Sequence, residues 1–559
     1  MPKVIGVCLT VLALSLSAAP ALAAPAVRAL AAGAVASPDR YGALAAREIL
    51  RAGGNAVDAA VATAFTLAVT YPEAGNLGGG GFMTLYMDGK PYFLDYRETA
   101  PAGATADMYL EANGEPSPVL SQFGNLSVGV PGTVRGMAEA HRRFGKLSWK
   151  QDLAPAIRYA RLGFLVGPAL IAMREDNEKP FAGLNFHASF GAMKAGQVFR
   201  QPELAATLQR IADAGDAEFY RGRTADLLVA QMARGSPKGL ITKADLVGYT
   251  AVWRDPIAAD WRGFTVITAP PPSSGGIALM QLLMMKQDAA HLFAGVPLNS
   301  PQYLHLVSEM EKRVFADRAE YLGDTDFTPV PVAALIDPAY VARRAAEIDP
   351  AKPSPTAAVK PGLEKPQTTH FSIVDRDGNA VANTYTLNGW FGAGVVVEGA
   401  GFLLNDEMDD FSAKPGAPNA FGVVGGAANA IAPGKRPLSS MTPTVLTRHG
   451  RVAMVIGTPG GSRIFTSVFQ VLADVYDFHL PLKTALAQMR FHHQLLPENT
   501  IYAEPYAPIP PALAAAMTKR GYRIETQDFN GDIEAIAVEG RTPIPASDPR
   551  DRGVSMVVP

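Results

Sequence analysis

The segment Lys365–Asn388 reads KPQTTHFSIVDRDGNAVANTYTLN, and its pattern predicts a β-hairpin. Two runs rich in β-branched and aromatic residues flank the turn sequence DRDGN at Asp375–Asn379. If Asp377 is the centre of the turn, Thr368 faces Thr386 across the hairpin. A two-residue turn centred on Asp377 and its following glycine would place the next threonine of the first strand opposite Thr386 instead. In either register, a threonine at the start of the first strand meets the end of the second strand.

Thr368 is a candidate nucleophile only if it becomes the first residue of a chain. The α-amine of an N-terminal threonine acts as its general base, so this hypothesis requires cleavage of the Gln367–Thr368 bond. The preceding segment, Lys352–Pro366, holds four prolines and few apolar residues, which predicts an exposed, extended strap where a cut is tolerated. The ordinary alternative is that a pair of threonines simply suits a β-strand.

Length and composition exclude several classes of protein. The chain has 559 residues, 48% of them hydrophobic, and a net charge of −2 without a long basic run. This length suits three or four domains or one large α/β unit, and the charge predicts no nucleic-acid partner.

The first residues predict export from the cytoplasm. Lys3 precedes an apolar run, Val4–Ser17, and small residues follow at 21–23, so residues 1–23 are interpreted as a signal peptide of a periplasmic or secreted protein. The apolar run is shorter than the roughly 20 residues of a membrane span, and no later segment qualifies. Cys8 is the only cysteine, so the exported protein would have no thiol, disulfide or cysteine-based metal site.

The remaining chain alternates helical and strand patterns. Apolar spacing predicts two helices within Tyr41–Val69, with a break at glycines 53–54. A run of four glycines then leads into strands at Phe82–Met87 and Tyr92–Tyr96. The region Leu147–Ile336 is predicted to be mostly helical with proline-rich breaks. A further strand, Val452–Ile456, runs through a glycine turn into a helix, which aims backbone N–H groups at one point and suits an oxyanion.

Charged residues at two places allow both structural and functional interpretations. Arg97 follows a predicted strand, where it either pairs with Asp95 or Glu98 or binds a substrate carboxylate through its guanidinium fork. The four carboxylates within 406–410 would ordinarily form a solvated face or a calcium loop. Their apolar neighbours indicate that part of the cluster is drawn inward, where it could bind an ammonium group. The adjacent histidines 492 and 493 would point to opposite faces of a strand, which disfavours metal binding.

Together these motifs resemble the bacterial γ-glutamyltranspeptidases of the N-terminal-nucleophile hydrolase superfamily. The resemblance extends from about Val35 to Arg550 and rests on segments in the family's order: Gly53–Ala60, Gly75–Met83, Pro270–Gly276, Thr368–His370, Asn405–Phe411, Pro437–Met441 and Pro459–Arg463. It implies an α/β (α+β) fold, a four-layer αββα sandwich built jointly by two subunits. These would be a large subunit, 24–367, and a small catalytic subunit, 368–559, which are cut from one precursor and stay associated as a heterodimer.

The resemblance also implies a role for each site residue. Thr368 would be the nucleophile, Thr386 would orient its hydroxyl, and the N–H groups of Gly460 and Gly461 would form the oxyanion hole. The substrate's α-carboxylate would be bound by Arg97, Ser439 and Ser440, and its α-ammonium by Asn388, Glu407 and Asp410. Substrates would be glutathione and other γ-glutamyl compounds, with water, amino acids or peptides as acceptors. No cofactor and no metal is implied.

Two positions bear on this comparison. Position 407 is Glu in some members of the family and Gln in others, and Glu407 should strengthen ammonium binding. Position 421, in a predicted lid loop, is Phe where lid-bearing members have a tyrosine whose hydroxyl closes over the site. We therefore expect the lid around Phe421 to close less firmly and to admit water or bulkier acceptors.

Two alternatives remain for the function. A glutaryl or cephalosporin-type acylase of the same superfamily would bind a side chain without an ammonium group and would not need Asp410. A non-catalytic periplasmic protein that binds γ-glutamyl compounds would be expected to lack Thr368 or the Gly460-Gly461 turn, and the chain retains both.

Overall fold

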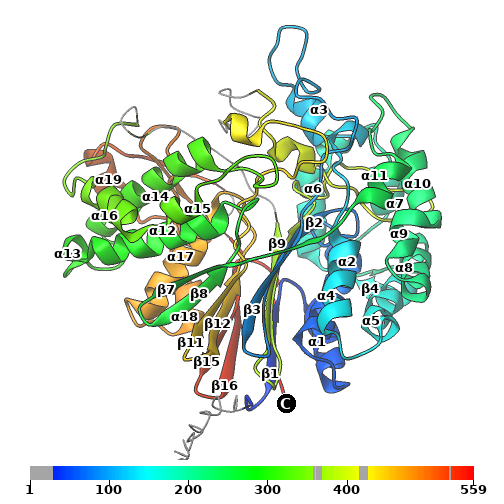
Figure 1. Cartoon of the computed structure of the whole chain (residues 1–559), viewed down its shortest axis with the longest axis horizontal. Coiled ribbons are helices and arrows are strands. Elements are labelled where there is room, and N and C mark those ends of the chain that lie inside the picture. The colour runs from blue at the N-terminus through cyan, green and yellow to red at the C-terminus, as the bar shows by residue number, and fades with distance from the viewer. Residues whose placement is uncertain (1–28, 357–358, 360–367, 415–425, 528–530) are drawn as a thin grey trace, which may run out of the picture.

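The computed structural model describes residues 29–356, 359, 368–414, 426–527 and 531–559. The predicted signal peptide, Gln367 and Phe421 lie outside these residues. Two antiparallel sheets pack face to face, and helices cover the outer face of each sheet (Figure 1). The expected four-layer αββα arrangement is therefore confirmed.

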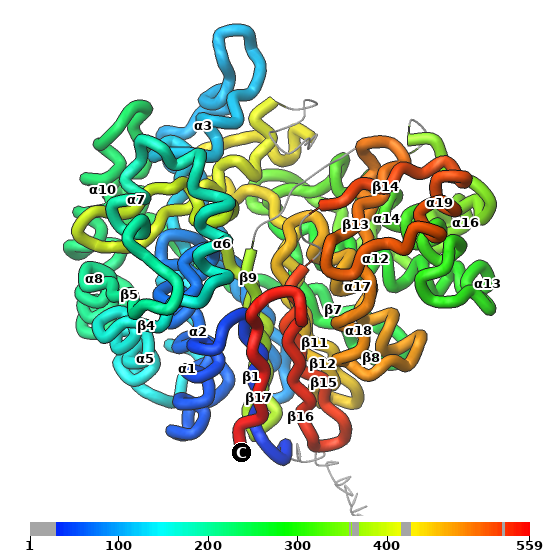
Figure 2. The backbone as a smooth tube through the Cα atoms, turned by 180° about the vertical axis from the view of Figure 1, so that it is seen from behind, coloured from blue at the N-terminus to red at the C-terminus, as the bar shows by residue number. Residues whose placement is uncertain are grey.

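The first sheet has seven strands, and the hairpin predicted to carry the nucleophile lies at its centre. The strand order is β17 (Val554–Val558), β1 (Gly33–Ser37), β9 (Thr369–Val374), β10 (Ala380–Thr386), β2 (Gly80–Met87), β3 (Lys90–Tyr96) and β6 (Val252–Arg254). The first and last strands of the described chain, β1 and β17, are neighbours in this sheet, and β1 also pairs with β9 (Figure 2).

The second sheet has six strands and draws on both halves of the chain. Its order is β16 (Thr542–Ser547), β15 (Glu534–Glu539), β12 (Arg451–Gly457), β11 (Thr444–Arg448), β8 (Phe264–Thr268) and β7 (Ile257–Trp261). The two sheets meet over small and β-branched side chains such as Ala36, Ala382 and Val455. Side chains of this size allow the sheets to approach closely with few voids.

The β9–β10 hairpin has the register that places the centre of its turn at Asp377. Val374 pairs with Ala380, and Thr369 pairs with Tyr385, which continues to Thr368 opposite Thr386. The turn is fixed by the Asp375 carboxylate, which accepts the backbone N–H of Asn379 at 3.0 Å and its side-chain amide at 2.9 Å. Both strands are buried along their whole length, because each face of the sheet is covered.

The helical layer on the first sheet begins with the two helices expected from the sequence, α1 (Arg40–Arg51) and α2 (Ala56–Thr70). Asn55 and Asp58 form a capping box at the start of α2, and every residue of that helix is buried. The other helices on this side are α3 (Pro118–Gln122), α4 (Thr133–Phe144), α5 (Trp149–Leu162), α6 (Pro168–Asn177), α7 (Phe186–Phe190), α8 (Pro202–Ala214), α9 (Ala217–Arg221), α10 (Arg223–Met232) and α11 (Lys243–Gly248). A short pair, β4 (Phe164–Leu165) and β5 (Val198–Phe199), links two of these segments.

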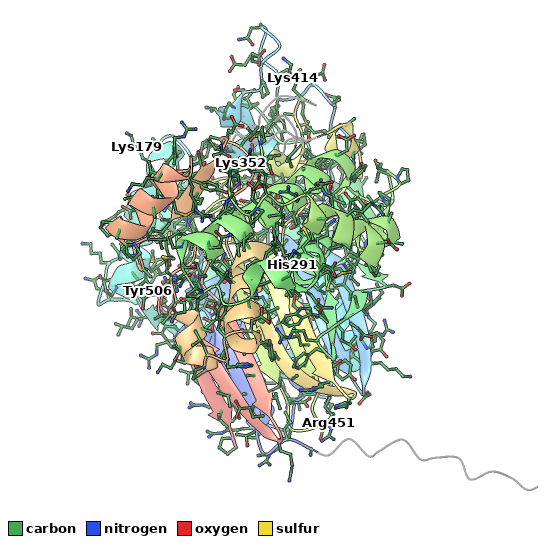
Figure 3. All side chains as sticks on the ribbon, turned by 90° about the vertical axis from the view of Figure 1, so that its left-hand side faces the viewer. Lys179, His291, Lys352, Lys414, Arg451 and Tyr506 are labelled. Atoms are coloured by element: carbon green, nitrogen blue, oxygen red, sulfur yellow. The ribbon has the colours of Figure 1, made fainter. Side chains whose placement is uncertain are left out.

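The opposite layer packs on the second sheet. Its central helices are α12 (Gly275–Asp288), α14 (Pro301–Tyr321) and α17 (Arg463–Tyr476), which share one hydrophobic core. Around them lie α13 (Ala290–Phe293), α15 (Val332–Leu335), α16 (Pro338–Ala346), α18 (Leu482–Leu486), α19 (Pro511–Lys519), β13 (Thr500–Ala503) and β14 (Arg523–Thr526). Side chains surround these layers on every side of the view in Figure 3.

The region 147–336 is mostly helical, as expected, and it also contains the strands β6, β7 and β8, which were not predicted. These strands contain too few apolar residues for the sequence pattern alone to distinguish a strand period from a helical period. Pairing of β8 with β11, whose partner residues lie 178 to 182 positions later in the chain, stabilises the strand conformation there. Among the described residues, no helix has the length and apolar character needed to cross a membrane.

Candidate active site

The predicted site residues gather at the start of β9. One small pocket is lined by eleven residues, and nine of them are predicted site residues: Arg97, Thr368, Thr386, Asn388, Glu407, Asp410, Ser439, Ser440 and Gly461. Met441 and Ile464 complete the lining. Gly460 is not among the lining residues and lies directly before Gly461 in the same turn. The structure thus brings together side chains that are more than 350 positions apart in the sequence.

Thr368 lies at the base of this pocket and is almost fully buried, with 4% of its surface exposed. Thr386 ends the neighbouring strand, and its hydroxyl oxygen accepts the backbone N–H of Asn388 at 2.8 Å. The Thr386 oxygen is the acceptor in this hydrogen bond, so the hydroxyl proton of Thr386 is not used in it. Asn388 adopts a positive φ of 74°, a conformation that Asn tolerates better than most residues. This bend turns the chain after β10 back toward the pocket.

His370 is the histidine nearest to Thr368 in the sequence, and its surroundings do not suit a general base. Its two ring nitrogens lie 2.8 Å from the Thr384 hydroxyl and 3.0 Å from the Ser372 hydroxyl. Burial lowers the pKa of His370 to about 3, so the ring is neutral at neutral pH. Because both nitrogens are occupied, the ring has no nitrogen to offer Thr368.

The turn between β12 and α17 has the conformation expected of a glycine-dependent anion site. Gly460 has a φ of 135° and Gly461 a φ of 51°, and residues with a β-carbon rarely adopt such values. The turn leads directly into the 14-residue helix α17, whose N-terminal dipole favours negative charge. Among the described residues, the N–H groups of these two glycines have no hydrogen-bond acceptor.

Arg97 is fully buried and contacts the acids that were predicted to bind an ammonium group. Its guanidinium forms ion pairs with Glu407 and Asp410, whereas Glu98 is 3.6 Å away. Its remaining donors contact the backbone carbonyls of Pro437 and Leu438, each at 3.3 Å. With these groups in contact, the pocket encloses about 20 Å³, room for little more than one water molecule. The predicted pairing of Arg97 with Glu98 is confirmed, and Glu407 and Asp410 are additional partners that were not anticipated. Binding of a substrate carboxylate by Arg97 stays a prediction.

Three carboxyl groups surround the single Arg97 cation, and this crowding affects their protonation. Burial raises the pKa of Glu407 to about 8, against the opposing effect of Arg97. Burial likewise raises the pKa of Glu98 to about 8, again against Arg97. Burial thus disfavours the charged form of Glu407 and Glu98, and the Arg97 cation favours it.

The acidic cluster at 406–410 is divided between the pocket and the protein framework. Glu407 and Asp410 line the pocket. The Asp406 carboxylate accepts the N–H of Gly389 at 2.7 Å, and the Asp409 carboxylate accepts the hydroxyl of Ser121. Asp406, Glu407 and Asp409 are all at least 97% buried, so the prediction that part of the cluster is drawn inward is confirmed.

Ser439 and Ser440 are held by the turn at residues 270–276. The Ser439 carbonyl accepts the N–H of Ser274 at 2.7 Å and its hydroxyl at 2.8 Å. Arg318, from α14, donates to the hydroxyls of Ser274 at 3.0 Å and Ser440 at 3.3 Å. The sequence analysis gave no role to Ser274, although it lies in the 270–276 turn, or to Arg318, because α14 contains several other charged residues and its pattern does not single out this one.

The structure also groups three possible metal ligands that the sequence analysis did not anticipate. Ligand atoms of Asp58, His141 and Asp152 lie within 4.8 Å of one another. The Asp58 carboxylate already accepts the backbone N–H groups of Asn55 and Lys146 at 2.8–3.0 Å, and His141 Nε2 lies 3.0 Å from the Leu147 carbonyl oxygen. Because the Asp58 carboxylate and His141 Nε2 are already engaged, we assign no metal to this group.

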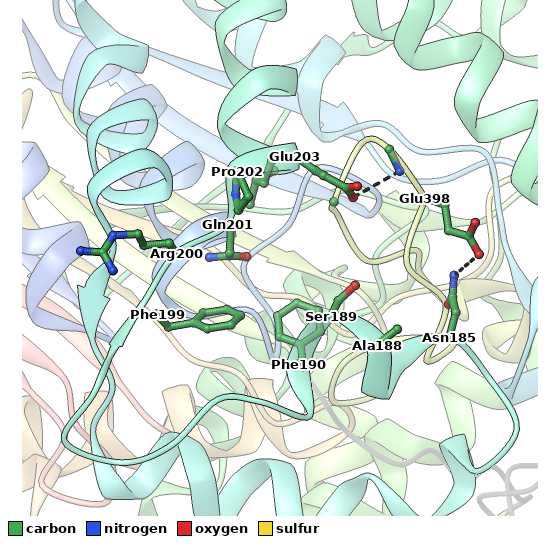
Figure 4. A pocket seen from close by; sticks show the side chains of 13 residues that line it. Asn185, Ala188, Ser189, Phe190, Phe199, Arg200, Gln201, Pro202, Glu203 and Glu398 are labelled. Carbon is green, nitrogen blue, oxygen red and sulfur yellow. Dashed lines mark hydrogen bonds between the residues drawn. The ribbon is translucent and has the colours of Figure 1, made fainter.

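A larger cavity of about 500 Å³ lies away from the start of β9, among α7, β5, the start of α8 and the loop 398–401 (Figure 4). Phe190, Phe199 and Gln201 line it, and its acids are engaged by the protein. Glu203 accepts the N–H of Gly399 at 3.2 Å, and Glu398 forms an ion pair with Arg234. None of the predicted catalytic residues lies in this cavity, so the small pocket at Thr368 remains the candidate active site.

Comparison with known proteins identifies the family of this chain. A profile of the gamma-glutamyltranspeptidase family matches residues 42–558. The glutathione hydrolase proenzyme of Pseudomonas aeruginosa is 63% identical over 97% of this chain and 98% of its own length.

Two solved structures share the fold. The γ-glutamyltranspeptidase from Pseudomonas nitroreducens complexed with L-DON is 61% identical, with a TM-score of 0.58 over 59% of this chain and 99% of that chain. A cephalosporin acylase from Bacillus halodurans is 27% identical, with a TM-score of 0.80 over 98% of this chain and 99% of that chain. The chain belongs to the γ-glutamyltranspeptidase family.

Proposed function

We propose that the protein transfers the γ-glutamyl group of glutathione and related γ-glutamyl amides to water or to amino acid and peptide acceptors, with Thr368 as nucleophile. γ-Glutamyl transfer and hydrolysis is the activity of the family to which the chain belongs. The observation that carries the assignment to this pocket is that Thr368, one guanidinium, two carboxylates and two serines line it together.

The charges of the pocket complement the α-amino acid end of a γ-glutamyl substrate. Without substrate, Arg97 forms ion pairs with both Glu407 and Asp410. A zwitterion inserted between them gives its carboxylate to Arg97, Ser439 and Ser440 and its ammonium to the two acids. This exchange leaves the net charge of the site unchanged, so no charge is buried without a partner. The γ-carbonyl is then held at Thr368.

The chemistry follows from an N-terminal threonine. The α-amine of Thr368 takes the proton of its hydroxyl as the oxygen attacks the γ-carbonyl, and Thr386 orients that hydroxyl. The N–H groups of Gly460 and Gly461 stabilise the oxyanion. The protonated amine then gives its proton to the leaving amine, which leaves a γ-glutamyl ester on Thr368. Water or an acceptor amine attacks this ester, and the hydroxyl of Thr368 is restored.

The free α-amine requires cleavage of the precursor. We propose that the Thr368 hydroxyl attacks the carbonyl of Gln367 and forms an ester in place of the peptide bond. Water then hydrolyses this ester, and the products are a large subunit, 24–367, and a small subunit, 368–559. Arg97 comes from the first and the other pocket residues from the second, so the site exists only in the associated pair. We also propose a periplasmic or secreted location after removal of residues 1–23.

The test is denaturing electrophoresis of the purified protein with N-terminal sequencing of the smaller band. A small chain that begins at Thr368, together with release of nitroaniline from a γ-glutamyl 4-nitroanilide, is the expected result. Thr368→Ala should abolish both. The matched control is Thr369→Ala, which removes the adjacent, equally buried hydroxyl and should be processed and active. An uncut wild-type chain that turns over the anilide would contradict the proposed nucleophile.

The substrate's ammonium group distinguishes the proposed γ-glutamyl transfer from the acylase alternative. Glutaryl 4-nitroanilide has the same length and carboxylate but no ammonium. Because Glu407 and Asp410 both line the pocket, we expect a strong preference for the γ-glutamyl compound. Equal or faster turnover of the glutaryl compound would favour the acylase function.

A further inference from the structure

We propose that Arg318 is a positioning residue for substrate binding, which makes the Ser440 hydroxyl a donor to the substrate's α-carboxylate. This inference rests on the proposed function, because it concerns the carboxylate end of the same pocket. Arg318 does not line the pocket itself. It acts through Ser440, which does.

The direction of the hydrogen bonds follows from the chemistry of the guanidinium group. Arginine has five N–H donors and no acceptor. Its Nε donates to the Ser274 hydroxyl oxygen at 3.0 Å, and one terminal nitrogen donates to the Ser440 hydroxyl oxygen at 3.3 Å. Both serine oxygens are therefore acceptors from Arg318, and each serine must direct its own proton elsewhere.

The proton of Ser274 has a fixed acceptor. Its hydroxyl donates to the Ser439 carbonyl oxygen at 2.8 Å. The Ser440 hydroxyl lies 3.3 Å from the Ser274 hydroxyl. Since the proton of Ser274 is directed at Ser439, Ser274 does not donate to Ser440 in that contact. A substrate carboxylate is a stronger acceptor than a hydroxyl, so the Ser440 proton turns toward it when substrate binds.

The fold holds Arg318 rigidly for this task. Arg318 lies near the end of the 21-residue helix α14 and is 4% exposed. Ser274 directly precedes α12, and the preceding residue, Ser273, forms a β-bridge with Ser439. Two helices of the large-subunit segment thereby fix two serines of the small-subunit segment. The charge of Arg318 also polarises the Ser440 hydroxyl, because a hydrogen bond from a charged donor strengthens the next bond in the chain.

The experiment compares three competitive inhibitors of γ-glutamyl anilide hydrolysis. L-Glutamate has both charged groups at its α-carbon, glutarate lacks the ammonium, and 4-aminobutyrate lacks the α-carboxylate. Arg318→Met should raise the inhibition constants of glutamate and glutarate by about 10- to 100-fold, the range for loss of a hydrogen bond to a charged group. The constant for 4-aminobutyrate should change less than about threefold, and kcat should fall much less than KM rises.

Two further variants keep the result interpretable. Arg313→Gln alters another arginine of α14, which is 98% buried and pairs with Glu309, and it should lower thermal stability without changing the ratio of the three constants. Arg318→Lys retains the charge without the fork and should give an intermediate ratio. It also serves as the test if Arg318→Met is not processed.

The outcomes separate this inference from the proposed function. Equal weakening of all three inhibitors, or no weakening of any, would overturn the positioning role of Arg318. Absence of anilide turnover by the processed wild-type protein would instead refute the proposed function, before any variant is compared.

Discussion

Replacement of Gly460 by alanine tests whether the backbone conformation of the β12–α17 turn provides catalysis. A β-carbon at this position would meet its nearest atoms, Cβ of Arg463 and Cα of Gly531, at 3.7 Å, which is ordinary van der Waals contact. The substitution therefore causes no steric clash. Its cost comes from the φ of 135°, which alanine rarely adopts.

Two effects are expected, and they share one origin. If the turn keeps its conformation, the strain lowers the free energy of unfolding by about 1–3 kcal/mol. If it relaxes to a negative φ, the N–H groups of residues 460 and 461 turn away from Thr368. Loss of one such donor costs about 10²–10³ in rate. We expect the second effect to dominate, because relaxation of the backbone to a negative φ relieves this strain.

The assay is kcat/KM for a γ-glutamyl anilide, normalised to the amount of processed small subunit, together with the melting temperature. Gly521→Ala is the matched control, because Gly521 has a φ of 97°, is exposed and has no atom nearer than 3.9 Å to its added β-carbon. The control should lose stability and keep its activity. If Gly460→Ala retains kcat/KM within about threefold of this control, the oxyanion function of the turn is wrong.

Two further predictions concern buried carboxyl groups. Asp410→Asn should raise KM for the γ-glutamyl anilide by about 10-fold or more through loss of a charged partner for the ammonium, and leave KM for the glutaryl anilide nearly unchanged; equal effects on both substrates would contradict the ammonium role. Burial, reinforced by Asp58, raises the pKa of Asp152 from its ordinary 3.8 to about 9. The proton bound to Asp152 therefore stabilises the folded protein fully below about pH 4, and this stabilisation is lost as the pH rises to about 9. Urea unfolding should therefore show the wild type losing up to about 1.4 kcal/mol per pH unit relative to Asp152→Asn between pH 6 and pH 9; parallel pH profiles of the two proteins would contradict the protonated state of Asp152.

The β9–β10 hairpin, the glycine turn and the first two helices could be predicted from the sequence because their signals are local. The turn sequence at 375–379 and the β-branched runs around it are sufficient to predict the β9–β10 pair, and the structure selects the register with Asp377 at its centre. The glycines at 460 and 461 likewise mark a turn whose positive φ values only glycine adopts readily. The helices α1 and α2 follow from their apolar spacing and the cap at Asn55.

The strands β6, β7 and β8 show where local signals were insufficient. They are short, and they lie in a region whose other elements are helices. Their strand conformation depends on pairing with β3 and β11, which are far away in the sequence. A pattern read within a short window contains no information about such a partner.

The candidate site also has features that local sequence indicates and features that depend on tertiary contacts. The sequence by itself indicated which residues could act, because a threonine at the start of a hairpin strand, a guanidinium fork and a glycine turn each have a recognisable chemistry. Only the tertiary structure decided their partners: Arg97 contacts Glu407 and Asp410, and Arg318 contacts Ser440. The physical reason is that an ion pair or hydrogen bond acts over a few ångströms, whereas these partners are 122 to 313 positions apart in the chain. Their contact exists only once both sheets and their helical layers have packed.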